Sequence, residues 1–228
     1  MDAQYECPPF FKIILGSTGT SDRSIIIYDS DKFELLDFME LRHVNIGGRV
    51  RAPLVAKFKV KSSGTEFFFM VNHLYRSKAA RRLQQASMLN DWASRQQLPV
   101  IAVGDYNFDW SVIDGDTDHD EGYDNMTANS VFEWVRPAIL LNTHDSDFNS
   151  VLDFVFASRD AKNWAVNSTI LVEHNDFPDT NETSDHRPVH AKFNLSQSAS
   201  VSKEDILEKI EKLKEDIENL KELVEQLP

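Results

Sequence analysis

The stretch Leu98-Pro-Val-Ile-Ala-Val-Gly-Asp-Tyr-Asn-Phe-Asp109 decides the fold. Its apolar, β-branched run from Val100 to Val103 predicts a strand that is buried on both faces. The strand ends at Gly104, where the backbone can turn, and Asp105 and Asn107 follow directly. Polar side chains at the end of a buried strand are costly unless they bind something, and their oxygen atoms suit a divalent cation that carries a phosphate. The alternative is a simple turn, because Asp and Asn both stabilise strand exits.

The chain has 228 residues, enough for one large domain with an appendage. Helical spacing of apolar residues over 79–96 connects a predicted strand at 66–74 to the central strand, which indicates the crossover of an α/β layered domain. A Ser-rich stretch at 196–202 predicts a linker, and a charged helix follows at 203–228. We therefore expect one domain over 1–195, then the linker and the helix.

Composition and charge narrow the class of protein. The net charge of −13 argues against a broad basic face that grips nucleic acid nonspecifically, but a nuclease stays open because bound metal ions would supply positive charge at the phosphate. Cys7 is the single cysteine, so neither an internal disulfide nor a cysteine-based zinc cluster can form. Acidic residues concentrate in 109–129, which predicts a solvated loop. No run crosses a membrane and the N-terminus lacks the order of a signal peptide, so we expect a soluble, cytoplasmic protein that does not bind membranes.

Further polar side chains occupy the ends of other predicted strands. Asn72 and His73 end one strand, and Asp185 and His186 precede the last one. Asp153 lies within an apolar strand, where an acid needs a partner, and the natural partner is a histidine that it orients and charges. The alternative for each histidine is a structural role in the core, which is the commoner use of a histidine at a strand end.

Four motifs follow one another along the chain: Asn72-His73-Leu74, Gly104-Asp105-Tyr106-Asn107, Leu152-Asp153-Phe154-Val155-Phe156 and Ser184-Asp185-His186-Arg187-Pro188-Val189. With these motifs in this order, the chain resembles the endonuclease/exonuclease/phosphatase superfamily, the DNase I-like proteins, over about residues 20–195. Each motif alone is weakly specific, but four in order on strands are strong. The resemblance implies an α/β (α+β) fold, a four-layer α/β/β/α sandwich of two mixed sheets with the site at one edge.

The resemblance also implies catalytic roles. His186 would be the general base, or would hold the attacking water, and Asp153 would orient its ring. His73 would be the acid or electrophile near the scissile phosphate. Asp105 would position the nucleophilic water and help to bind the metal, which would be Mg²⁺ or Mn²⁺, with Ca²⁺ as a further choice.

Other residues would complete this implied site. Asn107 would hydrogen-bond the phosphoryl oxygens and contribute to the metal site, and Asp185 would be a metal ligand. Asn72 would support the site beside His73 and contact the substrate. Arg51 matches a place where family members carry an arginine before Pro-Leu, and Arg76 follows the His73 motif closely. Either arginine would clamp a phosphate, or would equally well be a solvated surface residue.

One departure from the family pattern affects the metal site. Family members begin with a strand that carries a metal-binding Asn and a second strand that ends in a metal-binding Glu, and neither pattern precedes the strand at 24–28. Glu6 comes before Cys-Pro-Pro rather than after an apolar strand. Either a partner chain supplies these strands, or the chain is truncated, or metal binding is impaired.

The C-terminal segment predicts an oligomer through residues 203–227. Apolar residues there follow alternating spacings of four and three, the seam of a coiled coil: Ile206, Ile210, Leu213, Ile217, Leu220, Val224 and Leu227. The alternatives are a helix packed on its own domain, and an engineered fusion, which the regular Glu/Lys/Leu/Ile composition resembles.

Together these features predict a divalent-metal-dependent phosphodiester hydrolase, most readily a nuclease that cleaves DNA or RNA by metal- and His-assisted attack of water. Two alternatives stay open. One is a phosphatase or phosphodiesterase that acts on a small phosphate ester or a lipid headgroup. The other is a catalytically impaired scaffold or subunit that needs a partner to complete its site.

Overall fold

The computed structural model describes residues 8–20, 22–47, 50–113, 118–144, 149–173, 176, 184–195, 211 and 214. The chain divides into two compact units, Met1–Ser196 and Gln197–Pro228. Apart from 211 and 214, the predicted linker and coiled-coil helix lie outside the described residues. The oligomerising tail therefore stays a prediction.

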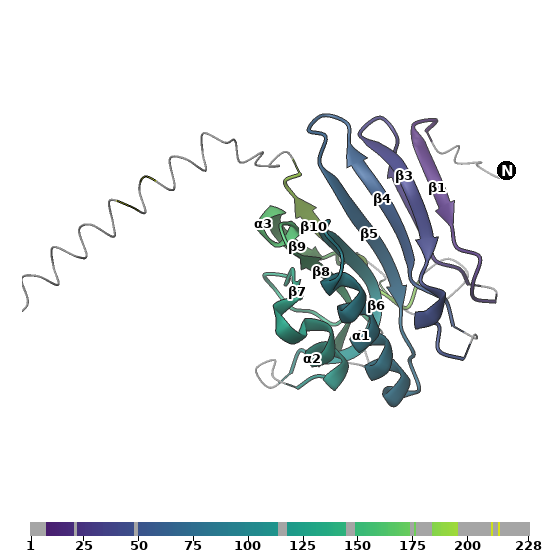
Figure 1. Ribbon diagram of the computed structural model, residues 1–228. Helices are drawn as coiled ribbons and strands as arrows, with labels where there is room; N and C mark the ends of the chain where they lie inside the picture. Colours follow the sequence, from purple (N-terminus) through teal and green to yellow (C-terminus); the bar gives the residue numbers. More distant parts are fainter. Residues whose placement is uncertain are drawn as a thin grey trace, which may run out of the picture. The chain divides into compact units, whose positions relative to one another are not determined.

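A six-stranded mixed sheet forms the centre of the first unit, in the order β3-β4-β5-β6-β8-β7 (Figure 1). Its strands are β3 (Phe33–Glu40), β4 (Leu54–Val60), β5 (Glu66–His73), β6 (Val100–Ser111), β7 (Phe132–Trp134) and β8 (Ser150–Ser158). β5 and β6 pair in parallel, and helix α1 (Ala79–Ser94) makes the crossover between them, while the other pairs in this sheet are antiparallel. The predicted strand–helix–strand unit is confirmed.

Helices cover one face of this sheet. Leu89 and Ala93 of α1 pack with Val100 and Phe156 of the sheet in one buried core. Helix α2 (Glu121–Thr127) joins the same core through Met126 and lies within 109–129, where a loop was predicted. Its first turn is fixed by Asp120, whose carboxylate accepts a hydrogen bond of 2.8 Å from the N–H of Gly122.

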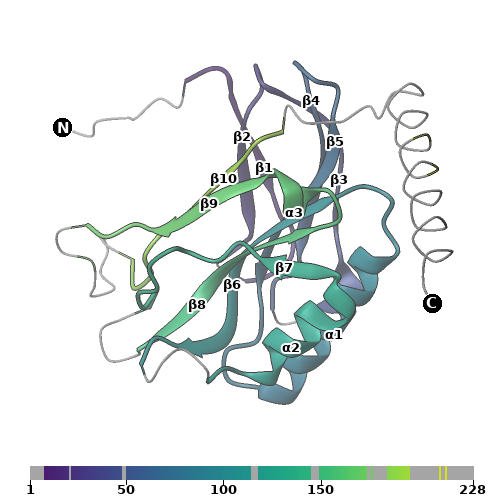
Figure 2. The ribbon, with the colours of Figure 1, turned by 90° about the vertical axis from the view of Figure 1, so that its left-hand side faces the viewer.

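Two small antiparallel sheets lie against the other face of the six-stranded sheet (Figure 2). One pairs β1 (Phe11–Leu15) with β2 (Ile25–Asp29), and the other pairs β9 (Ala165–Ile170) with β10 (Val189–Phe193). Ile14 and Ile26 from the first small sheet, and Trp164 of the single-turn helix α3 (Ala161–Trp164), pack there with Leu54 and Val155 in a second buried core.

The described part of the chain thus forms a mixed α/β fold of three layers: helices, the six-stranded sheet, and the pair of small sheets. The fourth, helical layer of the predicted sandwich is not found among the described residues. On the sheet of β1 and β2, the outward side chains of Ile13, Leu15, Ile25 and Ile27 are exposed, so no described helix covers them.

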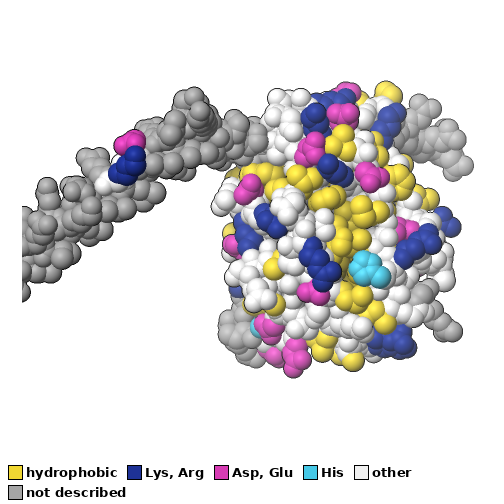
Figure 3. All heavy atoms as spheres, viewed as in Figure 1, with side chains coloured by type: hydrophobic (Ala, Val, Ile, Leu, Met, Phe, Trp, Pro, Cys, Tyr) yellow, Lys and Arg dark blue, Asp and Glu magenta, His cyan; other side chains and the backbone are white. Residues whose placement is uncertain are grey.

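The surface carries charges of both signs. On the face in view in Figure 3, hydrophobic side chains form a band through the centre, and basic and acidic residues lie scattered on either side. This face is therefore not a broad basic patch. Within the part of the chain that the structure describes, every helix is too short or too polar to span a bilayer.

Gly104 allows β5 and β6 to approach each other at the point where polar residues replace apolar ones. Its φ is +133°, and a Cβ atom at this position would lie 2.0 Å from the carbonyl oxygen of Asn72. Directly after it, Asn107 and Asp109 adopt left-handed φ values of 53° and 50°, and the pairing of β6 with β8 is interrupted between Asp105 and Trp110. The strand therefore bulges where its polar side chains emerge.

We expect Gly104→Ala to lower the free energy of unfolding by about 3 kcal/mol or more, because the alanine must leave a backbone region that favours glycine or push β5 away. Gly64→Ala is the matched control, since Gly64 also has a positive φ of +75° but a Cβ there would meet nothing within 4 Å. Its cost should be about 1 kcal/mol. Urea unfolding measures both, and equal losses would show that the contact with Asn72 does not constrain β6.

Candidate active site

Three predicted site residues lie in one row across neighbouring strands. The pairing register places His73 of β5 opposite Asp105 of β6, and Asp105 opposite Asp153 of β8. Residues that face each other in a sheet carry neighbouring side chains on the same face. Accordingly, Nε2 of His73 lies 3.7 Å from Oδ2 of Asp105. The structure therefore brings together side chains from three of the four motifs.

The fourth motif reaches this row through a β-bridge. His186 forms an antiparallel bridge with His144, and the N–H of Arg187 donates to the carbonyl oxygen of Thr143 at 2.8 Å. Thr143 is itself tied to β8, because its Oγ1 accepts a hydrogen bond of 3.2 Å from the N–H of Asp153. As a result, Nδ1 of His186 lies 2.7 Å from Oδ2 of Asp153.

The hydrogen bond to Asp153 controls the ring of His186. With the proton on Nδ1 donated to the carboxylate, Nε2 is left as the acceptor. Burial alone would lower the pKa of His186, but the hydrogen bond and charge of Asp153, helped by Asp105 and Asp185, raise that pKa above its usual value. The pair therefore makes His186 a stronger base than an isolated histidine.

His73 and Asp105 are shifted toward their neutral forms. Burial, with the positive charges of Arg51 and His186, lowers the pKa of His73 to about 4. Burial and the negative charge of Asp153 raise the pKa of Asp105 to about 7. At neutral pH His73 is uncharged and part of the Asp105 population carries a proton. Asp105 is thus better suited to release a proton than His73, to which the resemblance assigned the role of acid.

These side chains line a polar pocket of about 350 Å³, the site pocket. Arg51 and Arg76 line it as well, so two guanidinium groups stand beside the carboxylates and imidazoles. Arg51 is positioned by Asp22, with which it forms an ion pair and whose carbonyl oxygen accepts a hydrogen bond of 3.0 Å from its Nε. Asp22 also lines the pocket and carried no signal in the sequence.

Asn107 enters the same pocket from the bulge of β6. Its backbone N–H donates to Oδ1 of Asp105 at 2.9 Å, and its side-chain Nδ2 donates to the carbonyl oxygen of Leu74 at 3.3 Å. The short turn therefore fixes Asp105 as well as Asn107 itself. Asp105 and Asn107, the two polar side chains of the Gly-Asp-Tyr-Asn motif that line the pocket, therefore lie in one wall.

Asn72 is the one predicted site residue that does not line the site pocket. It is buried, and its side-chain Nδ2 donates to the hydroxyl of Tyr106 at 2.9 Å, in the core on the helix-covered face. Side chains alternate between faces along a strand, so Asn72 points away from the face that carries His73. The expectation that Asn72 contacts substrate is therefore corrected: it ties β5 to β6 from behind.

His144 belongs to the site but was missed in the sequence, where no motif marks it. Its side chain is buried, its Nε2 lies 3.3 Å from Oδ2 of Asp185, and its ring stands edge-on to that of His186 at 4.8 Å between centroids. These three residues bring one ligand atom each within 4.8 Å of one another. Two imidazoles and a carboxylate fit a first-row cation such as Mn²⁺ better than Mg²⁺. Asp105 was predicted as a ligand together with Asp185 and Asn107. Among the described residues, Asp105 does not belong to the group of His144, Asp185 and His186.

We expect the ring of His186 to titrate above its usual pKa and that of His73 near 4, in an NMR titration of the histidine side chains. Asp153→Asn should lower the pKa of His186, because it removes both the carboxylate charge and the charged acceptor of the Nδ1 proton. Asp91→Asn, at an exposed position of α1, is the control and should move neither ring. A His186 pKa that is the same in Asp153→Asn and the wild type would contradict the pairing.

No protein-family model matches the chain, and no curated protein matches it in sequence. Solved structures do match. An endonuclease/exonuclease/phosphatase family protein from Bacteroides thetaiotaomicron aligns with a TM-score of 0.60 and 21% identity, over 83% of this chain and 75% of its own. A mannosyl-6-phosphatase from Bacteroides thetaiotaomicron VPI-5482 aligns with a TM-score of 0.59 and 21% identity, over 82% of this chain and 78% of its own.

A third match is TDP2 from D. rerio, solved in complex with a single strand DNA product. It aligns with a TM-score of 0.60 and 16% identity, over 81% of this chain and 77% of its own. At these identities the likeness establishes the fold alone. The chain therefore has the fold of the endonuclease/exonuclease/phosphatase superfamily, the DNase I-like fold.

Proposed function

We propose that this chain is a divalent-cation-dependent phosphoester hydrolase whose substrate is nucleic acid, cleaved at a phosphodiester bond by water. The observation that carries the proposal is the Asp153–His186 pair, joined at 2.7 Å beside Asp105 in the site pocket. A carboxylate, an oriented imidazole and a second carboxylate with a raised pKa supply a base and an acid in one place.

The proton transfers follow from these protonation states. As the oxygen of a water attacks phosphorus, Nε2 of His186 takes a proton from that water, while Asp153 stabilises the imidazolium through Nδ1. The P–O bond to the leaving group breaks, and the leaving oxygen takes a proton from the protonated form of Asp105. His186 then loses its extra proton, and Asp105 regains one, through solvent.

The phosphoryl charge needs local positive groups, because the chain as a whole is acidic. Arg51 and Arg76 supply them at the wall of the pocket, where charge-assisted hydrogen bonds to phosphate oxygens are strong. His73, neutral with a pKa of about 4, donates a hydrogen bond rather than a proton. Positioning and charge stabilisation are the main requirements of phosphoryl transfer.

Of the group His144, Asp185 and His186, we assign His144 and Asp185 to a divalent cation, because Nε2 of His186 is the atom that takes the proton from the water. When bound, the cation supplies positive charge to the phosphoryl group. The imidazole nitrogen of His144 favours Mn²⁺ over Mg²⁺, because it is a softer ligand than a carboxylate oxygen.

Nucleic acid is favoured over a smaller ester because the binding surface continues beyond the site pocket. A second pocket of about 300 Å³ shares Arg51, His73 and Arg76 with it and is also lined by Tyr75 and Ser77. A phosphodiester with substituents on both sides would use both pockets, and the match to TDP2 with its single strand DNA product supports this choice. The second candidate is a small phosphate monoester, supported by the match to a mannosyl-6-phosphatase and by the limited size of the site pocket.

We expect the protein with Mn²⁺ to hydrolyse single-stranded DNA or RNA oligonucleotides faster than mannose 6-phosphate. His186→Ala should lower kcat about 10²- to 10⁴-fold, the usual contribution of a general base. His43→Ala is the control, since His43 is exposed on the short helix η1 (Arg42–Val44) and does not line the site pocket. Faster monoester hydrolysis would select the second candidate, and equal rates in His186→Ala and the wild type would remove both.

His144→Ala should weaken Mn²⁺ binding at least ~10-fold in calorimetric titrations, because it removes a buried donor from the cation site. His119→Ala is the control, because that histidine stacks on Trp110 outside the pocket, at 4.6 Å between ring centroids. Unchanged Mn²⁺ affinity in His144→Ala would contradict the assignment of His144. Absence of any Mn²⁺ binding by the wild type would instead favour a scaffold that needs a partner.

A further inference from the structure

Glu40, the last residue of β3, carries a nearly buried carboxylate that does not line the site pocket. Its side chain is 10% exposed. Among the described residues, four hydrogen bonds reach it from Ser17 and Thr18, in the loop that joins β1 to β2. The backbone N–H groups of Ser17 and Thr18 donate to Oε1 at 2.8 and 2.9 Å. The hydroxyl of Thr18 also donates to Oε1, at 2.7 Å, and the hydroxyl of Ser17 donates to Oε2 at 2.5 Å.

These donors keep the carboxylate of Glu40 ionised. Burial alone would raise the pKa of Glu40, but the hydrogen bonds from Ser17 and Thr18 lower it to about 2. A buried charge is costly unless it is hydrogen-bonded, and charge-assisted bonds hold their donors more firmly than neutral ones. Nη2 of Arg42 adds a positive charge 3.6 Å from Oε2 and donates to the hydroxyl of Ser17 at 2.9 Å. Glu40 therefore fixes the start of this loop.

Thr18 connects Glu40 to the segment that carries Arg51. The hydroxyl oxygen of Thr18 donates to Glu40 and accepts a hydrogen bond of 2.9 Å from the N–H of Ala52, the residue directly after Arg51. Ala52 is buried, so its N–H depends on an acceptor within the protein. The backbone next to Arg51 is thus tied to the carboxylate of Glu40 through one hydroxyl.

The same loop contacts the side chain of Arg51. Gly19 has a φ of +93°, and a Cβ atom there would lie 2.6 Å from the carbonyl oxygen of Asp22 and 3.3 Å from Cγ of Arg51. Asp22 forms an ion pair with Nη2 of Arg51, and its carbonyl oxygen accepts a hydrogen bond of 3.0 Å from Nε. The side chain of Asp22 is 66% exposed, that of Arg51 only 15%. An exposed aspartate holds an arginine in one direction only if its loop is fixed, and Glu40 fixes that loop.

We propose that Glu40 is a positioning residue for phosphate binding, which acts by holding the loop that orients the guanidinium of Arg51 in the site pocket. Asp22 engages Nε and Nη2 of Arg51, so we assign the phosphate oxygen to Nη1. The loop also shapes the second pocket, which Gly19, Thr20 and Asp22 line. This role rests on the proposed function in one respect, that Arg51 binds a phosphoryl group.

NMR of the arginine Nε–H groups in the full chain tests the positioning role without any ligand. We expect the Nε–H of Arg51 to exchange with water at least ~10-fold faster in Glu40→Ala, because the loop that carries its acceptor is no longer fixed. Glu40→Gln should lie between Glu40→Ala and the wild type, since it keeps an oxygen for the three bonds that Oε1 accepts. Thr18→Val keeps the carboxylate but removes the connecting hydroxyl, and gives the same test if Glu40→Ala does not fold. Glu34→Ala, at an exposed position of the same strand, is the matched control and should leave the exchange unchanged.

Calorimetric titration with inorganic phosphate tests the consequence for binding. Glu40→Ala and Thr18→Val should raise the phosphate dissociation constant at least ~5-fold, because a phosphate oxygen needs a correctly directed donor, whereas Glu34→Ala should not change it. A loss of folding stability with wild-type exchange at Arg51 would show a merely structural role and overturn the proposal. Faster exchange with unchanged phosphate affinity, or no phosphate binding by the wild type, would overturn it as well. None of these measurements involves hydrolysis, so their outcome is separate from that of the test on His186.

Discussion

The parallel pairing of β5 with β6 is the constraint on which the candidate site depends. Its register puts His73 opposite Asp105, and the antiparallel neighbour β8 adds Asp153 to the same row. Gly104 permits the close approach of the two parallel strands, because any side chain there would strike the carbonyl of Asn72. A shift of one residue would turn each of these groups into the core on the other face of the sheet.

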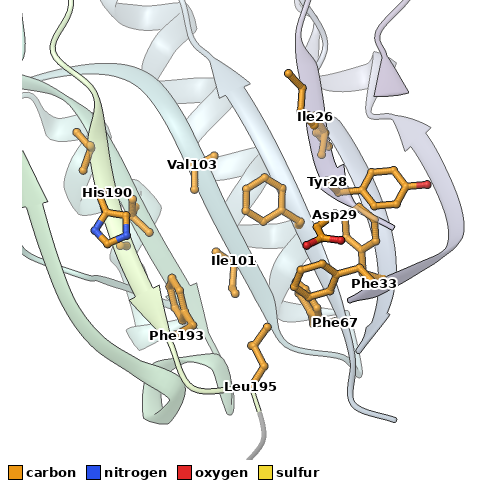
Figure 4. A pocket seen from close by; sticks show the side chains of 16 residues that line it. Ile26, Tyr28, Asp29, Phe33, Phe67, Ile101, Val103, His190, Phe193 and Leu195 are labelled. Atoms are coloured by element: carbon orange, nitrogen blue, oxygen red, sulfur yellow. The ribbon is translucent and has the colours of Figure 1, made fainter. Parts of the chain in front are cut away.

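Burial and mutual charge then give these groups different protonation states. Asp105 and Asp153 stand side by side, so the pKa of Asp105 is raised, while the carboxylate of Asp153 raises the pKa of the His186 imidazole that is hydrogen-bonded to it. The pairing of β6 with β8 places Asp105 beside Asp153, and the bridge between His144 and His186 places the ring of His186 beside the same carboxylate. An apolar pocket of about 510 Å³ lies over the same central strands and is lined by Phe69, Ile101 and Val103, among others (Figure 4).

Patterns within short stretches of sequence predicted the strands and helices whose formation depends mainly on those stretches. The apolar run at 100–103 and the helical spacing that precedes it suffice for the strand–helix–strand unit. The direction of Asn72 was not predictable in this way, because it depends on the register of β5 against β6. The helix α2 was missed inside an acidic stretch, since its seven residues are stabilised by the cap at Asp120 and by tertiary packing. His144 reaches the site only through its bridge to a segment far along the chain.

The most direct test of the account is a titration with inorganic phosphate, followed by NMR of the His73 and His186 rings and of the backbone amides of Asp105 and Asp153. These groups come from four separate segments, and the account holds that they form one anion-binding site. It predicts that all four signals move with a single dissociation constant. Responses with different constants, or a response of His186 without Asp105 and His73, would contradict it.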